Sequence, residues 1–507
     1  MSDHADRSIH QRFSTRWGLL FSVLGVAVGT GNIWRFPRIA AQNGGEHGAG
    51  AFLVSWVLFL FLWSIPLIVA EYAIGRRSRR GPVEALAAIG GRNLTWTGGF
   101  VAFVSAAITF YYAVVVGWCL YYLSQMVTAP LPLSTEAAFS TWNRFQASAW
   151  PSFFHALALV LCAFAIWKGI RSIERLNRWM IPTLLAIVLI SLVRALTLPG
   201  SWAGVAYLFT PDWEQLLQPR IWLEALTQNA WDTGAGWGLF LTYAAYMQRQ
   251  QPIVRNALLT GIGNNLVSLL AALIVFATVF SVLQTEMSLS RQETLEVLRS
   301  SGPASTGLTL IWMPQLFARM SLGTPLSILF FLGLTLAGFS SLMAMLELQA
   351  RVLVDAGLAR SRAVVLVAVV SYLLGIPSAL SLSFFANQDF VWGVALMISG
   401  ALVAFAVTRY GCERLRGEEL TADSGDLSPG RWWDASMRYV VPVGASVLLL
   451  WWLSLSATVY APDEWYNPLL PYSVMTCLVQ WGAVLTVLWL LNRRLPRGAT
   501  HETNPRH

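Results

Sequence analysis

Long apolar stretches separated by short polar segments run through almost the whole chain. A helix needs about 20 consecutive apolar residues to cross the hydrocarbon core of a bilayer. Twelve stretches meet or approach that length, so we expect an all-α membrane protein with about 12 transmembrane helices. These spans are predicted at 17–40, 49–74, 95–127, 151–167, 178–197, 221–248, 256–285, 325–355, 362–382, 388–411, 434–457 and 472–492.

The composition agrees with this pattern. Of 507 residues, 56% are hydrophobic and only 12% are charged, whereas a soluble chain has about a quarter charged residues. The four cysteines lie inside or at the ends of apolar runs without paired spacing, which predicts neither a disulfide framework nor a metal site. The first apolar run lacks a cleavage site and is expected to be a span rather than a signal peptide.

Positive charge is distributed unevenly between alternate loops. The segment 75–93 contains five arginines, whereas the loops 128–150, 198–220 and 286–324 carry few positive charges. Loops rich in Lys and Arg stay on the cytoplasmic side of a membrane. We therefore expect both termini to be cytoplasmic, in a multi-pass protein of the cell (inner or plasma) membrane.

Two spans contain features that interrupt a helix. The first has three glycines, Gly25, Gly29 and Gly31, followed directly by Asn32, and the sixth opens on the glycine-rich stretch 228–238. Close packing through small residues is the plain explanation for such glycines, but it does not explain Asn32. Interrupted helices at corresponding positions of two halves are typical of inverted-repeat transporters, whose binding site lies near the bilayer midplane.

Six short motifs resemble those of the neurotransmitter:sodium symporter family (solute carrier 6-like), in its bacterial branch. In chain order they are GVAVGTGNIWRFP, FYYAVVVGW, QNAWDTGAGWG, NNLVS, LAGFSS and NQDF. The resemblance covers roughly residues 12–411. It implies a 5+5 inverted repeat with broken helices 1 and 6. The first repeat is expected at 17–200 (spans 1–5) and the second at 201–411 (spans 6–10, with outer loops 198–220 and 286–324). Around them are expected a cytoplasmic N-terminal segment 1–16, spans 11–12 with their preceding loop at 412–492, and a cytoplasmic tail 493–507.

The resemblance also implies which residues bind the cargo. A substrate pocket is expected from Ala27, Gly29, Thr30, Gly31, Ile108, Tyr112, Trp231, Gly234, Trp237, Ser341 and Met345. One sodium ion is expected at Ala27, Asn32, Asp232 and Asn264, with the Asp232 side chain as a ligand. A second is expected at Gly25, Val28, Ala337, Ser340 and Ser341. For Asn264 a helix–helix hydrogen bond is a fair competing role, as is ordinary burial for Tyr112.

The same resemblance implies two gates. Arg35 and Asp389 should pair across the outer vestibule, above a lid formed by Tyr112 and Trp231. On the inner side the gate residues are Tyr246 and Asp355, but their usual Arg and Trp partners fall on His10 and Phe13, so Arg12 is a candidate substitute. Glu71 lies in the second span and should hydrogen-bond unwound backbone. For Glu347 an interior hydrogen bond is expected.

Asp232 departs from the family pattern, in which Ser or Thr is usual. Chloride-dependent members place an anion here, and the serine that helps them is present as Ser268, whereas the expected tyrosine of the second span is Trp56. A carboxylate at 232 would supply the negative charge itself, so chloride should not be required. An unpaired buried charge tends to take up a proton, which raises the question of proton counter-transport. The competing view is that Asp232 only caps a half-helix.

Together these features predict a sodium-coupled symporter of a small zwitterionic amino acid, with two sodium sites and alternating access. Amine carriers of the family have an aspartate where this chain has Gly29, which favours a substrate with its own carboxylate. Alternatives are a carrier of an amine, an osmolyte or a divalent ion, or a non-transporting membrane sensor. We expect no enzyme activity and no nucleic-acid partner. The expected partners are the small-molecule solute and the lipid bilayer, and a homodimer is possible.

Overall fold

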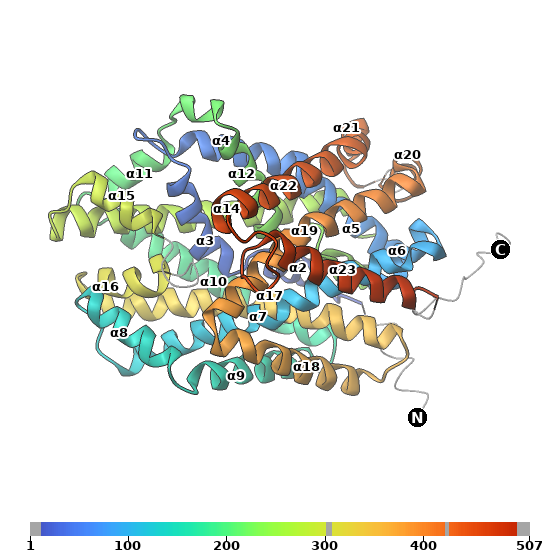
Figure 1. Cartoon of the computed structure of the whole chain (residues 1–507), viewed down its shortest axis with the longest axis horizontal. Helices are drawn as coiled ribbons and strands as arrows, with labels where there is room; N and C mark the ends of the chain where they lie inside the picture. Colours follow the sequence, from blue (N-terminus) through green and yellow to red (C-terminus); the bar gives the residue numbers. More distant parts are fainter. Residues whose placement is uncertain (1–11, 301–306, 421–424, 494–507) are drawn as a thin grey trace.

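The computed structural model describes residues 12–300, 307–420 and 425–493, and within these ranges it is built from helices and contains no β-strand. The all-α prediction is thereby confirmed (Figure 1). The helical segments of the first half are α2 (Arg16–Ala27), α3 (Thr30–Gln42), α4 (Gly50–Phe59), η1 (Leu60–Ser64), α5 (Ile65–Ser78), α6 (Pro82–Gly90), η2 (Arg92–Leu94), α7 (Thr95–Thr128), α8 (Thr135–Gln146), α9 (Trp150–Ile166), α10 (Ile170–Leu196), α11 (Ser201–Phe209) and η3 (Trp213–Leu217). Those of the second half are α12 (Pro219–Asp232), α13 (Leu239–Ala244), α14 (Ile253–Ser281), η4 (Val282–Glu286), α15 (Arg291–Arg299), η6 (Gly307–Trp312), α16 (Met313–Ala318), α17 (Gly323–Asp355), α18 (Arg360–Leu380), α19 (Leu382–Tyr410), α20 (Cys412–Leu415), η7 (Arg416–Leu420), α21 (Gly430–Ala435), η8 (Ser436–Val440), α22 (Val441–Leu455), η9 (Ser456–Tyr460) and α23 (Val474–Leu491).

Most of the predicted spans are long apolar helices. Among the described residues nine helices are long and apolar enough to cross a bilayer, or up to eleven if two bent pairs each count as one span. One bent pair is α2 with α3, and the other is α8 with α9. The remaining predicted span, 221–248, forms α12 and α13, each of which is too short to cross alone because the helix is interrupted.

The interrupted helices lie at the centre of the bundle. The long helices α7 and α17 pack against each other, and α2 and α3 both contact α14 and α17 (Figure 1). The first broken segment therefore packs against the continuous helices α14 and α17. Backbone groups freed at the breaks need partners inside the protein, since hydrocarbon offers none.

The first break falls at Val28 and Gly29. Both residues have extended backbone dihedrals, and α2 and α3 meet there at an angle of 48°. The Gly29 amide donates to Oδ1 of Asn32 at 2.7 Å, so the side chain of Asn32 caps the new helix. The C-terminal end of α2 and the N-terminal end of α3 consequently face the same small space.

The second break is the linker from Thr233 to Gly238. Gly234, Gly236 and Gly238 have φ angles of +70°, +85° and +78°, a region that favours glycine because other residues are strained there. The buried carboxylate of Glu71 accepts hydrogen bonds from the amides of Gly236 (2.7 Å), Gly238 (3.2 Å) and Leu241 (3.1 Å). This is the contact with unwound backbone that the resemblance implies for Glu71.

Both described ends of the chain lie beside arginine-rich loops. At the N-terminal side, Ser14 and Thr15 donate to the carboxylate of Glu174 at the start of α10. At the C-terminal side, the amide of Trp96 donates to Asn492, which follows α23. The two ends therefore share one end of the bundle.

The contacts of Glu71 predict a stability effect. Glu71→Ala should leave three buried backbone N–H groups without an acceptor, and each unsatisfied group costs about 1–3 kcal/mol. We expect a clear fall in Tm of the purified protein, with Glu71→Gln intermediate because its amide offers one oxygen. The exposed outer-loop residue Glu214 provides the control Glu214→Gln, which should leave Tm unchanged. An unaltered Tm in Glu71→Ala would contradict this role.

Candidate functional site

A cavity of about 1030 Å³ leads from the two helix breaks to the outer loops. Its inner part is formed by the α2–α3 break, α7, the α12–α13 break and α17, and its outer part by residues such as Arg220, Pro471 and Tyr472. Ten of the eleven predicted substrate residues line it: Ala27, Gly29, Thr30, Gly31, Tyr112, Trp231, Gly234, Trp237, Ser341 and Met345. The exception is Ile108, which is fully buried and does not reach the cavity.

The wall at the first break offers polar groups. The Tyr112 hydroxyl lies 3.2 Å from both the amide and the hydroxyl of Thr30. A Cβ added to Gly29 would lie 3.0 Å from Ser341 Oγ and 3.2 Å from Tyr112 OH, so glycine leaves room for a ligand there. The N-terminus of α3 carries a partial positive charge and the C-terminus of α2 a partial negative one. The break thus presents both signs of charge to the cavity.

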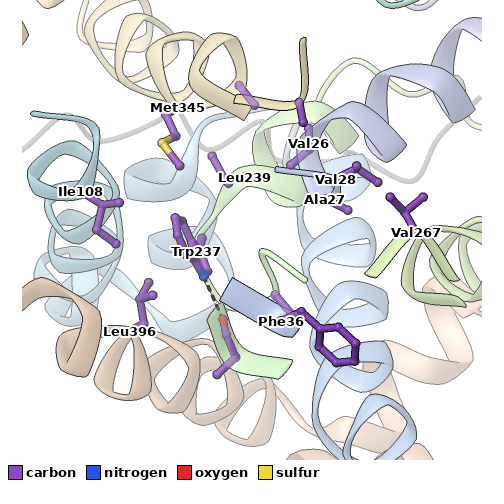
Figure 2. Close-up of a cluster of buried hydrophobic side chains, with 14 of the residues drawn as sticks. Val26, Ala27, Val28, Phe36, Ile108, Trp237, Leu239, Val267, Met345 and Leu396 are labelled. Carbon is purple, nitrogen blue, oxygen red and sulfur yellow. Dashed lines mark hydrogen bonds between the residues drawn. The ribbon is translucent and has the colours of Figure 1, made fainter. Parts of the chain in front are cut away.

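Two tryptophans shape the other wall. The rings of Trp231 and Trp237 pack edge to face with centroids 6.0 Å apart. The Trp237 indole donates from Nε1 to the carbonyl of Ala230 at 3.1 Å (Figure 2). The Trp231 indole lies directly against Gly393 of α19, where any larger residue would overlap it.

One cluster of oxygens joins α2 to α17. It is the place where the sequence predicts the sodium ion bound by Ser340 and Ser341. The hydroxyl of Ser341 lies 3.4 Å from the carbonyl oxygen of Gly25 and 3.5 Å from that of Val28. The hydroxyl of Ser340 lies 3.5 Å from the Val28 carbonyl and 2.9 Å from that of Ala337. All five predicted ligands therefore lie together. Each hydroxyl has a single proton, so the carbonyl oxygens outnumber the donors, as suits a hard cation that prefers oxygen ligands.

A second cluster lies between α2, α12 and α14, where the other sodium ion was predicted. One terminal atom of the Asn264 amide is 3.0 Å from the Ala27 carbonyl oxygen and 3.3 Å from the Asp232 carbonyl oxygen. With the amide oxygen in that position, three oxygens converge, which fits a cation. With the amide turned round, its nitrogen would instead donate to both carbonyls.

Asn32 and Asp232 differ from the expected arrangement at this cluster. The amide nitrogen of Asn32, rather than its oxygen, faces Asn264 (2.8 Å) and Ser268 (2.7 Å), because the oxygen accepts from Gly29. The Asp232 backbone carbonyl, rather than its side chain, faces Asn264. The carboxylate instead accepts from the Ser268 hydroxyl at 2.6 Å through Oδ2, and Oδ1 is buried without a hydrogen-bond partner.

The outer gate residues are apart. Arg35 and Asp389 both line the cavity, but no ion pair within 4.0 Å joins them in the described structure, so the predicted pairing is not present in this conformation. The physical reason is that the Arg35 guanidinium stacks 4.9 Å above the ring of Trp231. The cavity remains continuous with the outer loops as a result.

The opposite end of the bundle carries a different set of pairs from those predicted. Among the described residues no hydrogen bond joins Tyr246 to Asp355. The Tyr246 hydroxyl donates to Glu347 at 2.6 Å, and Arg360 donates to the same carboxylate at 2.5 Å. The expected interior hydrogen bond of Glu347 is therefore present.

Arg351 links the two predicted inner gate residues. It forms a 3.0 Å ion pair with Asp355 and lies 5.2 Å over the ring of Tyr246. Arg12 forms no ion pair within 4.0 Å with a carboxylate of the described chain, and His10 lies outside the described residues. Phe13 is buried beneath this network, and its amide donates to the Tyr246 carbonyl at 3.2 Å.

Sequence reasoning missed the roles of Arg351 and Arg360. The available signal was Glu347 itself, since an acidic residue inside a span calls for a nearby positive partner. The described residues contain no group of three or more His, Cys, Asp or Glu side chains that could hold a metal.

Comparisons with known proteins agree with the sequence motifs. The model of the sodium:neurotransmitter symporter family matches residues 10–149 and 149–494. An uncharacterised sodium-dependent transporter of Methanocaldococcus jannaschii is 29% identical over 85% of this chain and 88% of its own length. The sodium-dependent serotonin transporter of Drosophila melanogaster is 29% identical, over 93% and 82%. The crystal structure of MhsT in complex with L-phenylalanine has a TM-score of 0.73 at 26% identity, covering 87% of this chain and 99% of that one.

The oxygen cluster around Ser340 generates a prediction. If this hydroxyl ligates sodium, Ser340→Ala should raise the sodium concentration for half-maximal thermal stabilisation by about tenfold, since a hydrogen bond or ligand to a charge contributes about 1.5–3 kcal/mol. Ser327 is a matched control on the same helix, buried and bonded only to Thr324 of its own turn. Ser327→Ala should keep the parent sodium dependence. If Ser340→Ala keeps the same sodium dependence as Ser327→Ala and the parent protein, Ser340 is excluded as a ligand.

Proposed function

The chain belongs to the sodium:neurotransmitter symporter family, and we propose that it is a sodium-coupled symporter of a small zwitterionic amino acid. Its sodium-dependent relatives support sodium as the coupling ion. The solute would bind at the two helix breaks, from which it would be released inward after the outer cavity closes. The two five-helix repeats predicted from the sequence would move relative to each other in that step, in the inner or plasma membrane with both termini in the cytoplasm.

The observation that carries this proposal is the polarity of the first break. Because α2 ends at Ala27 and α3 begins at Thr30, opposite ends of two helix dipoles meet beside the cavity. A carboxylate suits the amides at the start of α3, and an ammonium group suits the carbonyls at the end of α2. The Tyr112 hydroxyl adds a further donor. A zwitterion matches both signs, whereas an amine would lack a carboxylate partner at Gly29.

The two oxygen clusters support two coupling ions. Each cluster joins carbonyls of the first break to a continuous helix, α17 through Ser340 and Ser341, or α14 through Asn264. A bound cation would therefore hold the break in one arrangement relative to the bundle. Sodium would pre-form the substrate site in this way, which couples the two binding events.

Asp232 supports chloride independence. The Ser268 hydroxyl, which could help to bind an anion, already donates to the Asp232 carboxylate. A fixed negative charge beside the ion cluster takes the place that chloride would otherwise fill. Protonation of this buried carboxylate when sodium is absent would allow a proton to leave as sodium returns.

Uptake into proteoliposomes tests the proposed function. An inward sodium gradient should drive accumulation of radiolabelled alanine, whereas choline in place of sodium, or gramicidin to dissipate the gradient, should abolish it. Gluconate in place of chloride should leave the rate unchanged. Ethylamine, which keeps the ammonium group but lacks the carboxylate, should not compete. Equal uptake in choline would contradict sodium coupling, and binding without uptake would favour a sensor.

Replacing Asp232 tests the built-in anion. A charge pair about 4 Å apart interacts by about 4 kcal/mol at an effective dielectric of about 20. Losing part of it in Asp232→Ser should raise the sodium concentration for half-maximal uptake by about tenfold or more, and added chloride should partly restore affinity. The exposed Asp463 gives the control Asp463→Ser, with no effect expected. If uptake by the parent protein fails without chloride, the built-in-anion role of Asp232 is contradicted, and Asp232 is left with the role of a helix cap.

A further inference from the structure

Trp237 occupies an unusual place in the cavity wall. Its side chain lines the cavity but is only 4% exposed, so one edge faces the solute and the rest is buried. Ile108, which the sequence motifs place in the substrate pocket, does not line the cavity. Figure 2 shows the indole flanked by Ile108, Met345 and Leu396. The space beside Ile108 is therefore filled by protein.

The position of the indole is fixed by its own contacts. Its Nε1 donates to the Ala230 carbonyl at 3.1 Å, which ties the ring back to the end of α12. The ring also packs against Trp231 with a centroid separation of 6.0 Å. Turning the indole away from the cavity would break this hydrogen bond in a buried setting, which is costly.

The backbone that carries Trp237 is fixed as well. Its carbonyl accepts from the Ser105 hydroxyl of α7. On either side, Gly236 and Gly238 donate to Glu71, and the Gly236 carbonyl accepts from Ser399 at 2.6 Å. A Cβ at Gly236 would lie 2.9 Å from the backbone of Gly400. The linker thus has no room to retreat when a larger solute arrives.

We infer that Trp237 is a size-limiting residue that restricts the solute to amino acids with very small side chains, such as glycine, alanine and serine. The inference rests on the proposed function and names the substrate class of the same site. A solute held by its carboxylate and ammonium at the first break projects its side chain towards the remaining inner wall, where Trp237, Gly234 and Met345 lie. Only a small group fits before it meets the immobile indole. Packed protein interiors resist added methylenes.

Direct sodium-dependent binding to the purified full-length protein tests this limit. Radiolabelled alanine is the reporter, and glycine, serine, leucine, methionine and phenylalanine are the competitors. In the parent, leucine and phenylalanine should compete at least about tenfold more weakly than alanine or glycine, a factor that one methylene can produce in a fitted pocket. A parent that binds leucine or phenylalanine as well as alanine would overturn the inference and leave the proposed function standing.

Enlarging the pocket should shift the preference. Trp237→Leu replaces the indole in the cavity wall by a smaller side chain, so the ratio of leucine to alanine affinity should rise by about tenfold or more. Trp237→Phe should move this ratio in the same direction by less. The matched control is Trp392→Leu: Trp392 is also buried, lies on α19 and does not line the cavity. That control should keep the parent ratio.

The outcomes separate the two claims. An unchanged ratio in Trp237→Leu and Trp237→Phe would overturn the role of Trp237. If Trp237→Leu fails to fold, the parent size preference and Trp237→Phe still decide the question. A parent that binds no amino acid of any size with sodium would overturn the proposed function, and the size limit with it.

Discussion

The fold depends on how backbone groups freed at membrane depth are satisfied. Two helices are interrupted inside the bundle, and each break releases carbonyl and amide groups that hydrocarbon cannot accommodate. At the second break a single carboxylate, Glu71, accepts three amides. At the first break carbonyl oxygens gather near the Ser340 and Ser341 hydroxyls, which have one proton each, and near the Asn264 amide, which either adds an oxygen or donates to the Ala27 and Asp232 carbonyls. The first break is therefore fit to bind cations, whereas the second is a rigid support.

The two ends of the bundle differ in whether their charged side chains form ion pairs. At the inner end two short ion pairs form, Arg360 with Glu347 and Arg351 with Asp355. At the outer end Arg35 stacks on Trp231 and leaves Asp389 across the cavity. With the orientation proposed above, this arrangement would correspond to a carrier open to the outside. Transport would require the outer charges to meet and the inner pairs to separate, which exchanges one set of interactions for another.

The sequence predicted the helices and the breaks well because apolar length and glycine clusters are local signals. It also predicted which residues would gather at the cavity, since family motifs preserve spacing. It failed where the outcome depends on side-chain competition. Ile108 is fully buried and does not reach the cavity, and the side-chain oxygen of Asn32 accepts from Gly29 rather than facing the cluster. The inner pairs of Arg351 and Arg360 are local in sequence: Arg351 and Asp355 are one turn apart on α17, and Arg360 begins α18, 13 residues after Glu347. They were missed because the family motifs do not include these positions.

The central claim is that oxygens of the first break hold two cations against α17 and α14. The most direct test is an anomalous difference map from crystals grown with thallium in place of sodium. We expect one peak among the oxygens of Val28, Ala337 and Ser340, and another among those of Ala27, Asp232 and Asn264. The claim would be contradicted by a map that lacks both peaks and in which the Asn264 amide nitrogen donates to the Ala27 and Asp232 carbonyls.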